Sequence, residues 1–274
     1  MKRILESELK QIGIEMLNYV DTICRANDIK YFIAFGTLIG AVRHKGFIPW
    51  DDDIDICISR TDFNKLLETI EKDGKYKVIS MDNDPNYYFP FARICDPRTI
   101  VLNRPFRKVK DFGVWIDVFP LENAPQLECR EEWLKEFYIR KKKMRATVPT
   151  PYEWNIINYL INYRFLLRYY RSFKLRRKYG KENFSKYRKD YIDWIDILNT
   201  KPSNEYFVAD TPYLYRTAFP KKYFDNVIDL DFEGLKVMAP QNYDEILRIT
   251  YGDYMQLPPL NKRKTHHHFK AYWK

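Results

Sequence analysis

The chain has 274 residues, of which 45% are hydrophobic and 31% are charged, and its formal net charge is +10. This composition excludes a mostly disordered chain, because enough apolar surface is present to build a core. No run of 18 apolar residues occurs, which excludes an ordinary membrane-spanning helix. Acidic side chains follow the N-terminus too early for the apolar region of a signal peptide, so we expect a cytoplasmic protein.

The spacing of apolar residues predicts a series of helices and strands in the first half of the chain. A helix is expected over 4–26, a strand over 31–35, a short helix after residue 37 through residue 42, a strand over 54–59 and a helix over 61–72 capped by Thr61. Further strands are expected over 76–81, 88–95, 99–102 and 114–119. This order predicts an α+β fold, in which helices flank a mixed sheet.

The second half of the chain changes in character. Residues 130–198 read as helical with breaks at Pro149 and Pro151, and residues 140–190 hold sixteen basic side chains against three acidic ones. A hairpin turning at Glu233-Gly234 and a helix over 243–251, capped by Gly252, follow. We therefore predict a catalytic core over 1–125, a basic helical subdomain over 126–200, and a mixed C-terminal segment over 201–274 that packs back on the core.

An acidic cluster carries the clearest chemical signal. Asp53 and Asp55 lie two residues apart at the start of an apolar strand, so their carboxylates face the same side about 6–7 Å apart. Asp117 interrupts a second apolar strand, and Asp51 joins the cluster if the first strand begins early. Two Mg²⁺ ions, or Mn²⁺, would suit such oxygen ligands and would support phosphoryl transfer. The alternatives are a solvated acidic turn and a solvent-facing Asp117.

Gly36-Thr37 stands where a strand is expected to pass into a helix. A glycine at such a junction lets backbone amides approach an anion, and a helix N-terminus favours negative charge. The dipeptide is a weak signal alone. Followed by the Asp-hydrophobic-Asp pattern, it predicts a phosphate cradle beside a metal site.

These features resemble the nucleotidyltransferase fold and, more closely, the LicD family of phosphotransferases. The matching blocks are residues 35–44, 47–55, 115–120 and 251–254, followed by Arg263. The resemblance places Asp53, Asp55 and Asp117 on the family's metal positions, with Asp117 as a candidate general base. It differs in one detail, since Gly36-Thr37 stands where the wider superfamily commonly has Gly-Ser.

The resemblance implies transfer of phosphocholine from CDP-choline to a sugar hydroxyl of a bacterial surface glycan, such as a teichoic acid precursor or lipooligosaccharide. Relatives that act on ribitol phosphate leave the transferred group open. Three other functions remain alternatives: a nucleotidyltransferase that modifies a small acceptor, a glycosyltransferase with an Asp-x-Asp metal site, and a basic nucleic-acid-binding protein. We expect no nucleic-acid partner, because the acidic cluster would then have no role.

Several basic residues are candidates for substrate contacts. They are Arg43, His44 and Lys45 after the short helix, Arg93 in an apolar strand, and Arg263, His266 and His267 near the C-terminus. Arg93 suits a phosphate, but an ion pair with Asp96 or another carboxylate is an equal alternative. The histidines are candidates for acceptor or phosphate contact, with metal binding as an alternative.

The basic helical region allows one further hypothesis. Arg164, Arg168 and Arg171 form a stripe at helical spacing beside a broad apolar face over 156–167. Such a helix can lie at an anionic membrane surface, so we predict salt-sensitive peripheral attachment to the inner face of the membrane. The alternative is an internal helix whose arginines face solvent.

Overall fold

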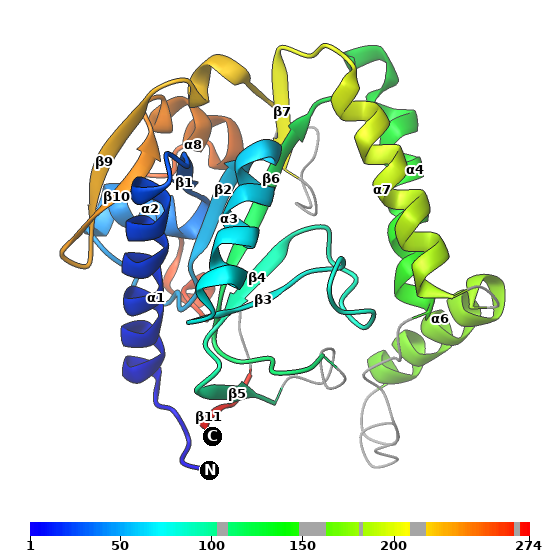
Figure 1. Cartoon of the computed structure of the whole chain (residues 1–274), viewed down its shortest axis with the longest axis horizontal. Helices are drawn as coiled ribbons and strands as arrows, with labels where there is room; N and C mark the ends of the chain where they lie inside the picture. The colour runs from blue at the N-terminus through cyan, green and yellow to red at the C-terminus, as the bar shows by residue number, and fades with distance from the viewer. Residues whose placement is uncertain (103–108, 148–162, 181–182, 209–217, 266–268) are drawn as a thin grey trace.

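The computed structural model describes residues 1–102, 109–147, 163–180, 183–208, 218–265 and 269–274 (Figure 1). Three sequence predictions lie outside these ranges: the helix breaks at Pro149 and Pro151, the apolar face over 156–162, and the roles of His266 and His267.

The first part of the chain alternates helices with strands. Its elements are α1 (Glu6–Ala26), β1 (Tyr31–Ile33), α2 (Phe35–His44), β2 (Asp55–Ser59) and α3 (Arg60–Asp73). The apolar spacing of α1 buries Ile12, Met16 and Val20 on one side of the helix. These elements follow the predicted order.

Two predicted boundaries in this part are wrong, and each has a local cause. The strand expected over 31–35 ends at Ile33, because Phe35 is already the first residue of α2. Thr61 does not cap α3: the Ser59 hydroxyl accepts the amide hydrogen of Asp62 at 3.2 Å, so the helix begins at Arg60. The sequence holds two hydroxyl residues here, Ser59 and Thr61, separated by Arg60, and the earlier one caps the helix.

Strands dominate the next part. They are β3 (Lys77–Ile79), β4 (Ala92–Cys95), β5 (Thr99–Val101) and β6 (Trp115–Asn123). The strand predicted over 88–95 is shorter than expected, since only its last four residues pair with β3 and β6. The strand predicted over 114–119 is longer and extends to Asn123, because additional partners bind its C-terminal half.

The rest of the chain adds helices and then returns to the sheet. The helical region contains η2 (Leu127–Cys129), α4 (Arg130–Thr147), α6 (Tyr163–Tyr179) and α7 (Phe184–Thr200). The remaining elements are β7 (Glu205–Val208), β8 (Ala218–Pro220), η4 (Lys221–Phe224), β9 (Val227–Phe232), β10 (Leu235–Pro240), α8 (Tyr243–Tyr251), η5 (Leu260–Lys262) and β11 (Ala271–Trp273). The predicted hairpin and final helix are present, and Gly252 follows α8 with a φ of +71°. The sequence analysis did not predict β7, β8 or β11.

Among the described residues, seven strands form one mixed sheet in which β1, β2, β6, β4 and β3 lie side by side. β2 and β6 are parallel, and β6 meets two partners on its other edge. β4 pairs with residues 115–118 and β7 with residues 121–123, so a strand from the C-terminal part continues the sheet where β4 ends. The α+β fold class is confirmed.

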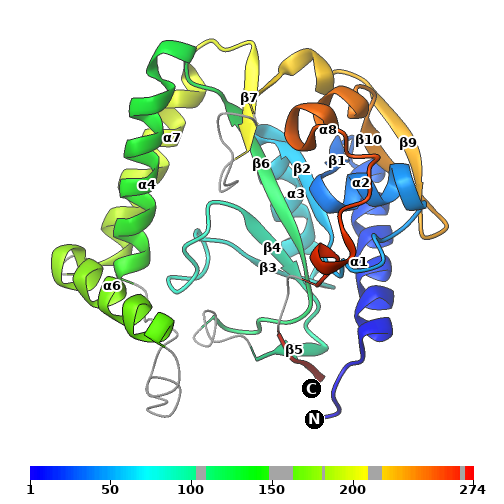
Figure 2. The same cartoon turned by 180° about the vertical axis from the view of Figure 1, so that it is seen from behind.

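The two faces of this sheet have different cover. Ile56, Ile58 and Ile116 pack into a core with α1 and α3 on the face toward the viewer in Figure 1. The opposite face, seen in Figure 2, carries Cys57 and Leu121 in a second cluster with α8. Because neighbouring residues of a strand point to opposite faces, Asp55 and Asp117 lie on the α8 side.

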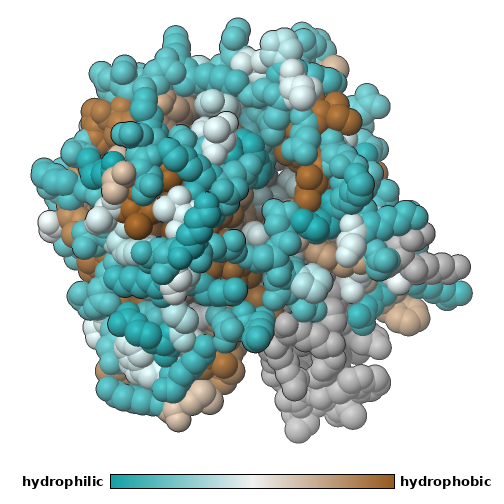
Figure 3. All heavy atoms as spheres, in the orientation of Figure 1, coloured by the Kyte–Doolittle hydropathy of each residue, from teal (hydrophilic) through white to brown (hydrophobic). Residues whose placement is uncertain are grey.

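The helical region has its own apolar cluster. Trp133 of α4 stacks on Trp194 of α7 with ring centroids 4.5 Å apart, and it meets Phe207 of β7 edge to face at 4.7 Å. On the face shown in Figure 3, hydrophobic side chains appear as separate patches among hydrophilic ones. Within the described ranges, no helix has both the length and the apolar character that crossing a membrane requires.

Candidate active site

Three carboxylates meet where β2 and β6 run side by side. Oxygens of Asp53, Asp55 and Asp117 all lie within 4.8 Å of one another. Asp55 is the first residue of β2 and stands directly opposite Asp117 in the parallel register. Asp51 and Asp52 form a second group of this kind with Asp53. The four predicted metal positions therefore share one acidic cluster.

Backbone and side-chain hydrogen bonds fix Asp55 from both sides. The Asp55 amide donates to the Thr37 hydroxyl at 2.9 Å, and its carbonyl accepts the Ala34 amide at 2.9 Å. The Asp117 amide donates to the carbonyl of Ile54 at 3.0 Å. Thr37, which is buried, thus anchors the start of β2 to the first turn of α2.

The electrostatics of the cluster favour a bound cation. Burial raises the pKa of the Asp55 carboxyl well above its ordinary value. The negative charges of Asp53, Asp117 and Asp51 raise it further, whereas Arg93 lowers it. Carboxylates that repel one another at this range are stabilised by a positive ion between them, and an all-oxygen donor set suits Mg²⁺.

Arg93 binds Asp117 inside the protein. Its Nε donates to Oδ1 of Asp117 at 2.6 Å, and the indole nitrogen of Trp115 donates to Oδ2 at 3.1 Å. The Arg93 side chain is 9% exposed, as is that of Asp117. Of the two alternatives from the sequence, the structure shows the ion pair, but with Asp117 rather than Asp96, which binds Arg98.

Gly36 lies in the first turn of α2 against the acidic loop. A Cβ atom at this position would overlap Oδ2 of Asp51, so glycine leaves room for the Asp51 carboxylate here. The N-terminal end of α2 also carries partial positive charge, which favours the carboxylates and any phosphate nearby. Anion binding by Gly36 and Thr37 stays a prediction.

The predicted Arg43-His44-Lys45 group lies at the other end of α2, about 12 Å along the helix from Gly36. Nη1 of Arg43 donates to the Tyr254 carbonyl at 2.7 Å and its Nε donates to Nε2 of His44 at 2.9 Å. Burial, and then the charge of Arg43, lower the pKa of His44, so the ring accepts this hydrogen bond as neutral imidazole.

Arg43 and Arg263 together form a positively charged spot. Burial lowers the pKa of Arg43, and the charge of Arg263 lowers it further. The guanidinium carbon of Arg263 lies 5.4 Å from the ring centroid of Trp50, the residue that precedes Asp51 in the chain. Among the described carboxylates, none forms an ion pair with either arginine. Two cations without such partners suit an anionic ligand.

Three aromatic residues beside the cluster escaped the sequence analysis. Phe35 precedes Gly36, Phe119 follows Asp117 by two residues on the same face of β6, and Tyr251 ends α8. Burial raises the pKa of Tyr251, and the nearby charges of Asp55 and Asp51 raise it further. The only sequence signal was their place inside the blocks that carry the family resemblance.

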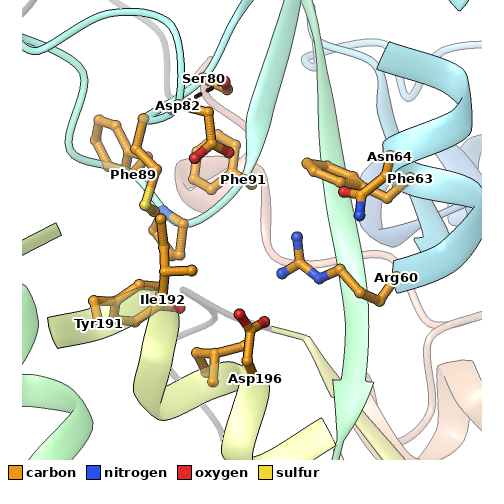
Figure 4. A pocket seen from close by; sticks show the side chains of 13 residues that line it. Arg60, Phe63, Asn64, Ser80, Asp82, Phe89, Phe91, Tyr191, Ile192 and Asp196 are labelled. Carbon is orange, nitrogen blue, oxygen red and sulfur yellow. Dashed lines mark hydrogen bonds between the residues drawn. The ribbon is translucent and has the colours of Figure 1, made fainter. Parts of the chain in front are cut away.

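A separate cavity of about 190 Å³ lies between α3, the segment before β4, and α7 (Figure 4). Arg60 points into it from the right of the view, Asp196 from below and Asp82 from above. Arg60 also forms an ion pair with the buried Glu122, which accepts a hydrogen bond from Asn199 of α7 at 2.7 Å. This polar network joins α3, β6 and α7 where β6 changes its edge partner.

Carboxylates on two neighbouring parallel strands, placed against the first turn of a helix, are an arrangement that suits a phosphotransferase of nucleotidyltransferase type. Residues 28–153 match the family model described as "LicD/FKTN/FKRP, nucleotidyltransferase domain". The chain therefore contains a LicD family nucleotidyltransferase domain over these residues.

Known proteins resemble the chain beyond that domain. It is 29% identical over 284 aligned positions to the lipopolysaccharide cholinephosphotransferase LicD of Haemophilus influenzae, with 99% of each chain covered. An uncharacterized protein of Rickettsia prowazekii is 64% identical over 51 residues, 18% of this chain and 19% of that protein. Another from Rickettsia typhi is 40% identical over 78 residues, 27% of this chain and 25% of that protein.

Proposed function

We propose that this protein transfers phosphocholine from a CDP-choline-type donor to a sugar hydroxyl of a bacterial surface glycan precursor. The observation that carries the proposal is the Asp53–Asp55–Asp117 cluster, whose oxygens lie within 4.8 Å of one another. The likeness to a lipopolysaccharide cholinephosphotransferase over 99% of both chains supports the transferred group and favours a lipopolysaccharide-type acceptor over a teichoic acid.

A divalent cation is part of the proposal. Asp53, Asp55 and Asp117 would hold Mg²⁺. Asp51 could supply a further carboxylate oxygen, because it forms a second group of close carboxylates with Asp52 and Asp53. Bound there, Mg²⁺ would neutralise donor phosphate charge and make the acceptor hydroxyl more acidic. Arg93 positions Asp117 for this role, because its guanidinium and the Trp115 indole hold both carboxylate oxygens.

The reaction joins the acceptor to the phosphorus that carries choline. The acceptor oxygen forms a bond to that phosphorus, the bond from this phosphorus to the bridging oxygen of the diphosphate breaks, and CMP leaves with that oxygen. The hydroxyl proton passes to a carboxylate of the cluster or to solvent. Arg43 and Arg263 are placed to bind the anionic part of a substrate, since Arg263 lies over the Trp50 ring and its charge acts on Arg43.

In this proposal, the basic helical region brings the enzyme to the membrane surface that carries the acceptor. The described part of α6 exposes Tyr170, Phe173 and Arg171. Aromatic and basic side chains exposed together suit an anionic membrane surface, where lipid-linked glycans are found. We therefore retain peripheral, salt-sensitive membrane attachment as part of the proposal.

Product analysis tests the proposed reaction. Purified protein is incubated with Mg²⁺, CDP-choline and a lipooligosaccharide acceptor, and the released nucleotide and the modified glycan are identified by mass spectrometry. Release of CMP together with a phosphocholine-bearing glycan is the expected result. A glycan or small acceptor that carries CMP would identify a nucleotidyltransferase instead, and the absence of turnover with every CDP-alcohol and acceptor tried would contradict the proposal.

A further inference from the structure

Three aromatic side chains stand around the acidic cluster on the α8 side of the sheet. Phe35 and Phe119 meet with ring centroids 5.3 Å apart and planes at 84°, so the two rings form a corner. Both are half-buried. Tyr251 is 44% exposed, and it lines the same small apolar cavity as Phe35 and Cys57. We call Phe35, Phe119 and Tyr251 the aromatic corner.

The corner lies at a defined distance from the metal-binding carboxylates. Phe119 follows Asp117 by two residues on one face of β6, which separates their Cα atoms by about 6–7 Å. Its register partner Cys57 follows Asp55 in the same way on β2. A group linked to a metal-bound phosphate by a short spacer would therefore reach these rings.

A neighbouring set of rings already surrounds a cation of the protein. The guanidinium carbon of Arg93 lies 4.4 Å from the Trp115 ring centroid, 5.4 Å from that of Phe112 and 5.5 Å from that of Phe91. In the part of the chain that the structure describes, no lysine or arginine lies over a ring of the aromatic corner in this way. Lysine and arginine side chains of the described residues therefore leave the corner without a cation over its rings.

Backbone strain supports a specific role for Phe35. Its φ of +46° lies in the left-handed region, where a bulky side chain is unfavourable. Strain of this kind persists where the surroundings impose it, and it is common at ligand sites. Here it places an aromatic ring at the first residue of α2, directly before Gly36.

The charge of the surroundings selects the ligand. Aromatic rings beside several carboxylates attract cations, and a quaternary ammonium is bound through its contact with ring faces because it cannot donate hydrogen bonds. We propose that Phe35, Phe119 and Tyr251 bind the trimethylammonium group of the phosphocholine being transferred. This inference rests on the proposed function and specifies the part of the site that distinguishes choline from other alcohols.

Donor isosteres test the inference. CMP release from CDP-choline is compared with release from CDP-ethanolamine and from the CDP ester of 3,3-dimethylbutanol, which has choline's shape without its charge. The wild-type protein should prefer CDP-choline to the neutral ester. Phe35→Leu, Phe119→Leu and Tyr251→Leu should each reduce that preference in kcat/KM by about 3- to 30-fold, mainly through KM. Tyr251→Phe should retain it.

Two measurements separate this from other roles of the rings. Phe89→Leu is the matched control, since the Phe89 ring already lies 5.6 Å from Arg93; it should affect both donors equally. Inhibition by CMP should be unchanged in the corner variants. Weaker inhibition by CMP, together with equal losses for all donors, would show that the rings stack on the nucleotide base and would overturn the inference.

The remaining outcomes keep the two proposals distinct. Wild-type turnover with an unchanged choline preference in all three leucine variants overturns the aromatic corner and leaves phosphocholine transfer intact. Absence of CMP release from every donor in the wild-type protein overturns the proposed function itself. Thermal unfolding of each variant identifies loss of fold, and Tyr251→Leu remains informative if the Phe119 variant unfolds, because Tyr251 is 44% exposed whereas Phe119 is half-buried.

Discussion

The carboxylate site and the helical region are held in place in different ways. Asp55 and Asp117 stand on adjacent strands whose backbones bond to each other and to α2, so their positions follow from the sheet itself. In the helical region, α4 and α7 meet through side chains such as Trp133 and Trp194. Backbone ladders leave little freedom, whereas side-chain packing tolerates adjustment. Chemistry that needs fixed distances therefore lies on the strands.

Charge follows the same division. In the site, the Arg93–Asp117 pair is buried, with both side chains 9% exposed. In the helical region, charged pairs such as Lys189–Asp193 are open to water, at 72% and 54% exposure. A buried pair must remain complete, because removing one partner leaves an unpaired charge inside the protein. Exposed pairs contribute little to stability, so this surface can change its charge to suit a partner.

The largest expected effect tests this difference in stability. Arg93→Met would leave the Asp117 carboxylate buried without its cation and should lower the free energy of unfolding by about 3–5 kcal/mol. Lys189→Met, which breaks an exposed pair on α7, should change it by less than about 0.5 kcal/mol. Urea unfolding followed by circular dichroism measures both. Similar losses in the two variants would show that the distinction between the regions is wrong.

The next effect concerns activity. Asp53→Asn and Asp55→Asn each remove a negative charge from the proposed metal site while keeping side-chain shape, and turnover should fall by at least about 100-fold with the fold retained. Asp117→Asn should behave in the same way. Asp193→Asn in the helical region is the control and should leave turnover unchanged. Chelation of divalent cations with EDTA should also abolish CMP release, and addition of Mg²⁺ should restore it.

A smaller change tests how closely the acidic loop must approach α2. Gly36→Ala places a methyl group where Oδ2 of Asp51 lies, so the Asp51 side chain must move. Turnover should fall by about 10-fold, since displacements of about 1 Å at a site cost up to about 100-fold. Gly13→Ala in α1 is the matched control, because its added carbon would contact the flexible end of Ile54 at 3.1 Å. Equal activity of the two variants would exclude a tight fit at Gly36.

Lys141 offers a pH test in the helical region. Burial, and then the charge of Arg145, lower the pKa of this α4 residue from 10.5 to about 8. Between these values the unfolded chain binds more protons than the folded one, so stability rises with pH across this window. From pH 7.5 to pH 10, the free energy of unfolding of the wild type should rise by about 1–2 kcal/mol relative to that of Lys141→Met. Lys142→Met, at an exposed position, should show no such trend.

The smallest effect tests the membrane contact. Arg171→Gln removes one exposed charge from α6 and should weaken binding to anionic vesicles at low salt by about fivefold, and the Arg164/Arg168/Arg171→Gln variant should weaken it further. Wild-type binding should disappear near 0.5 M salt, where the screening length of charges in solution is about 4 Å. Co-sedimentation with anionic and neutral vesicles measures this. Equal recovery in the supernatant with both kinds of vesicle would exclude the contact.

Local patterns in the sequence predicted the parts of the fold that depend on near neighbours. The bounds of α8 and the turn at Glu233-Gly234 follow from helical spacing and turn chemistry. The facing of Asp55 and Cys57 likewise follows from the alternation of β2, whereas Asp53 precedes this strand. Partners distant in the chain were not predictable in this way: β7 extends β6, and β11 pairs with β5, through contacts between residues far apart in the sequence.

The site shows the same limit. The acidic cluster was predictable because apolar residues flank Asp55 and Asp117 on both sides, which makes an unpaired charge costly there. The ion pair of Arg93 with Asp117 was not, because it depends on the register between β4 and β6. Phe35 and Phe119 were indistinguishable from core residues in the sequence, since an aromatic residue between apolar neighbours usually packs inside. Only the face of the sheet and the strained φ of Phe35 set them apart.

The number of strands that pair with β6 has a consequence for local unfolding. β6 is paired on one edge by β2 and on the other by β4 and then β7, and α1, α3 and α7 also contact it. Amide hydrogens of such a strand exchange with solvent only when the surrounding sheet opens as a unit. We therefore expect the amide of Asp117 to exchange slowly among the described residues, and its geometry should persist under conditions where the ends of α4 and α6 already open.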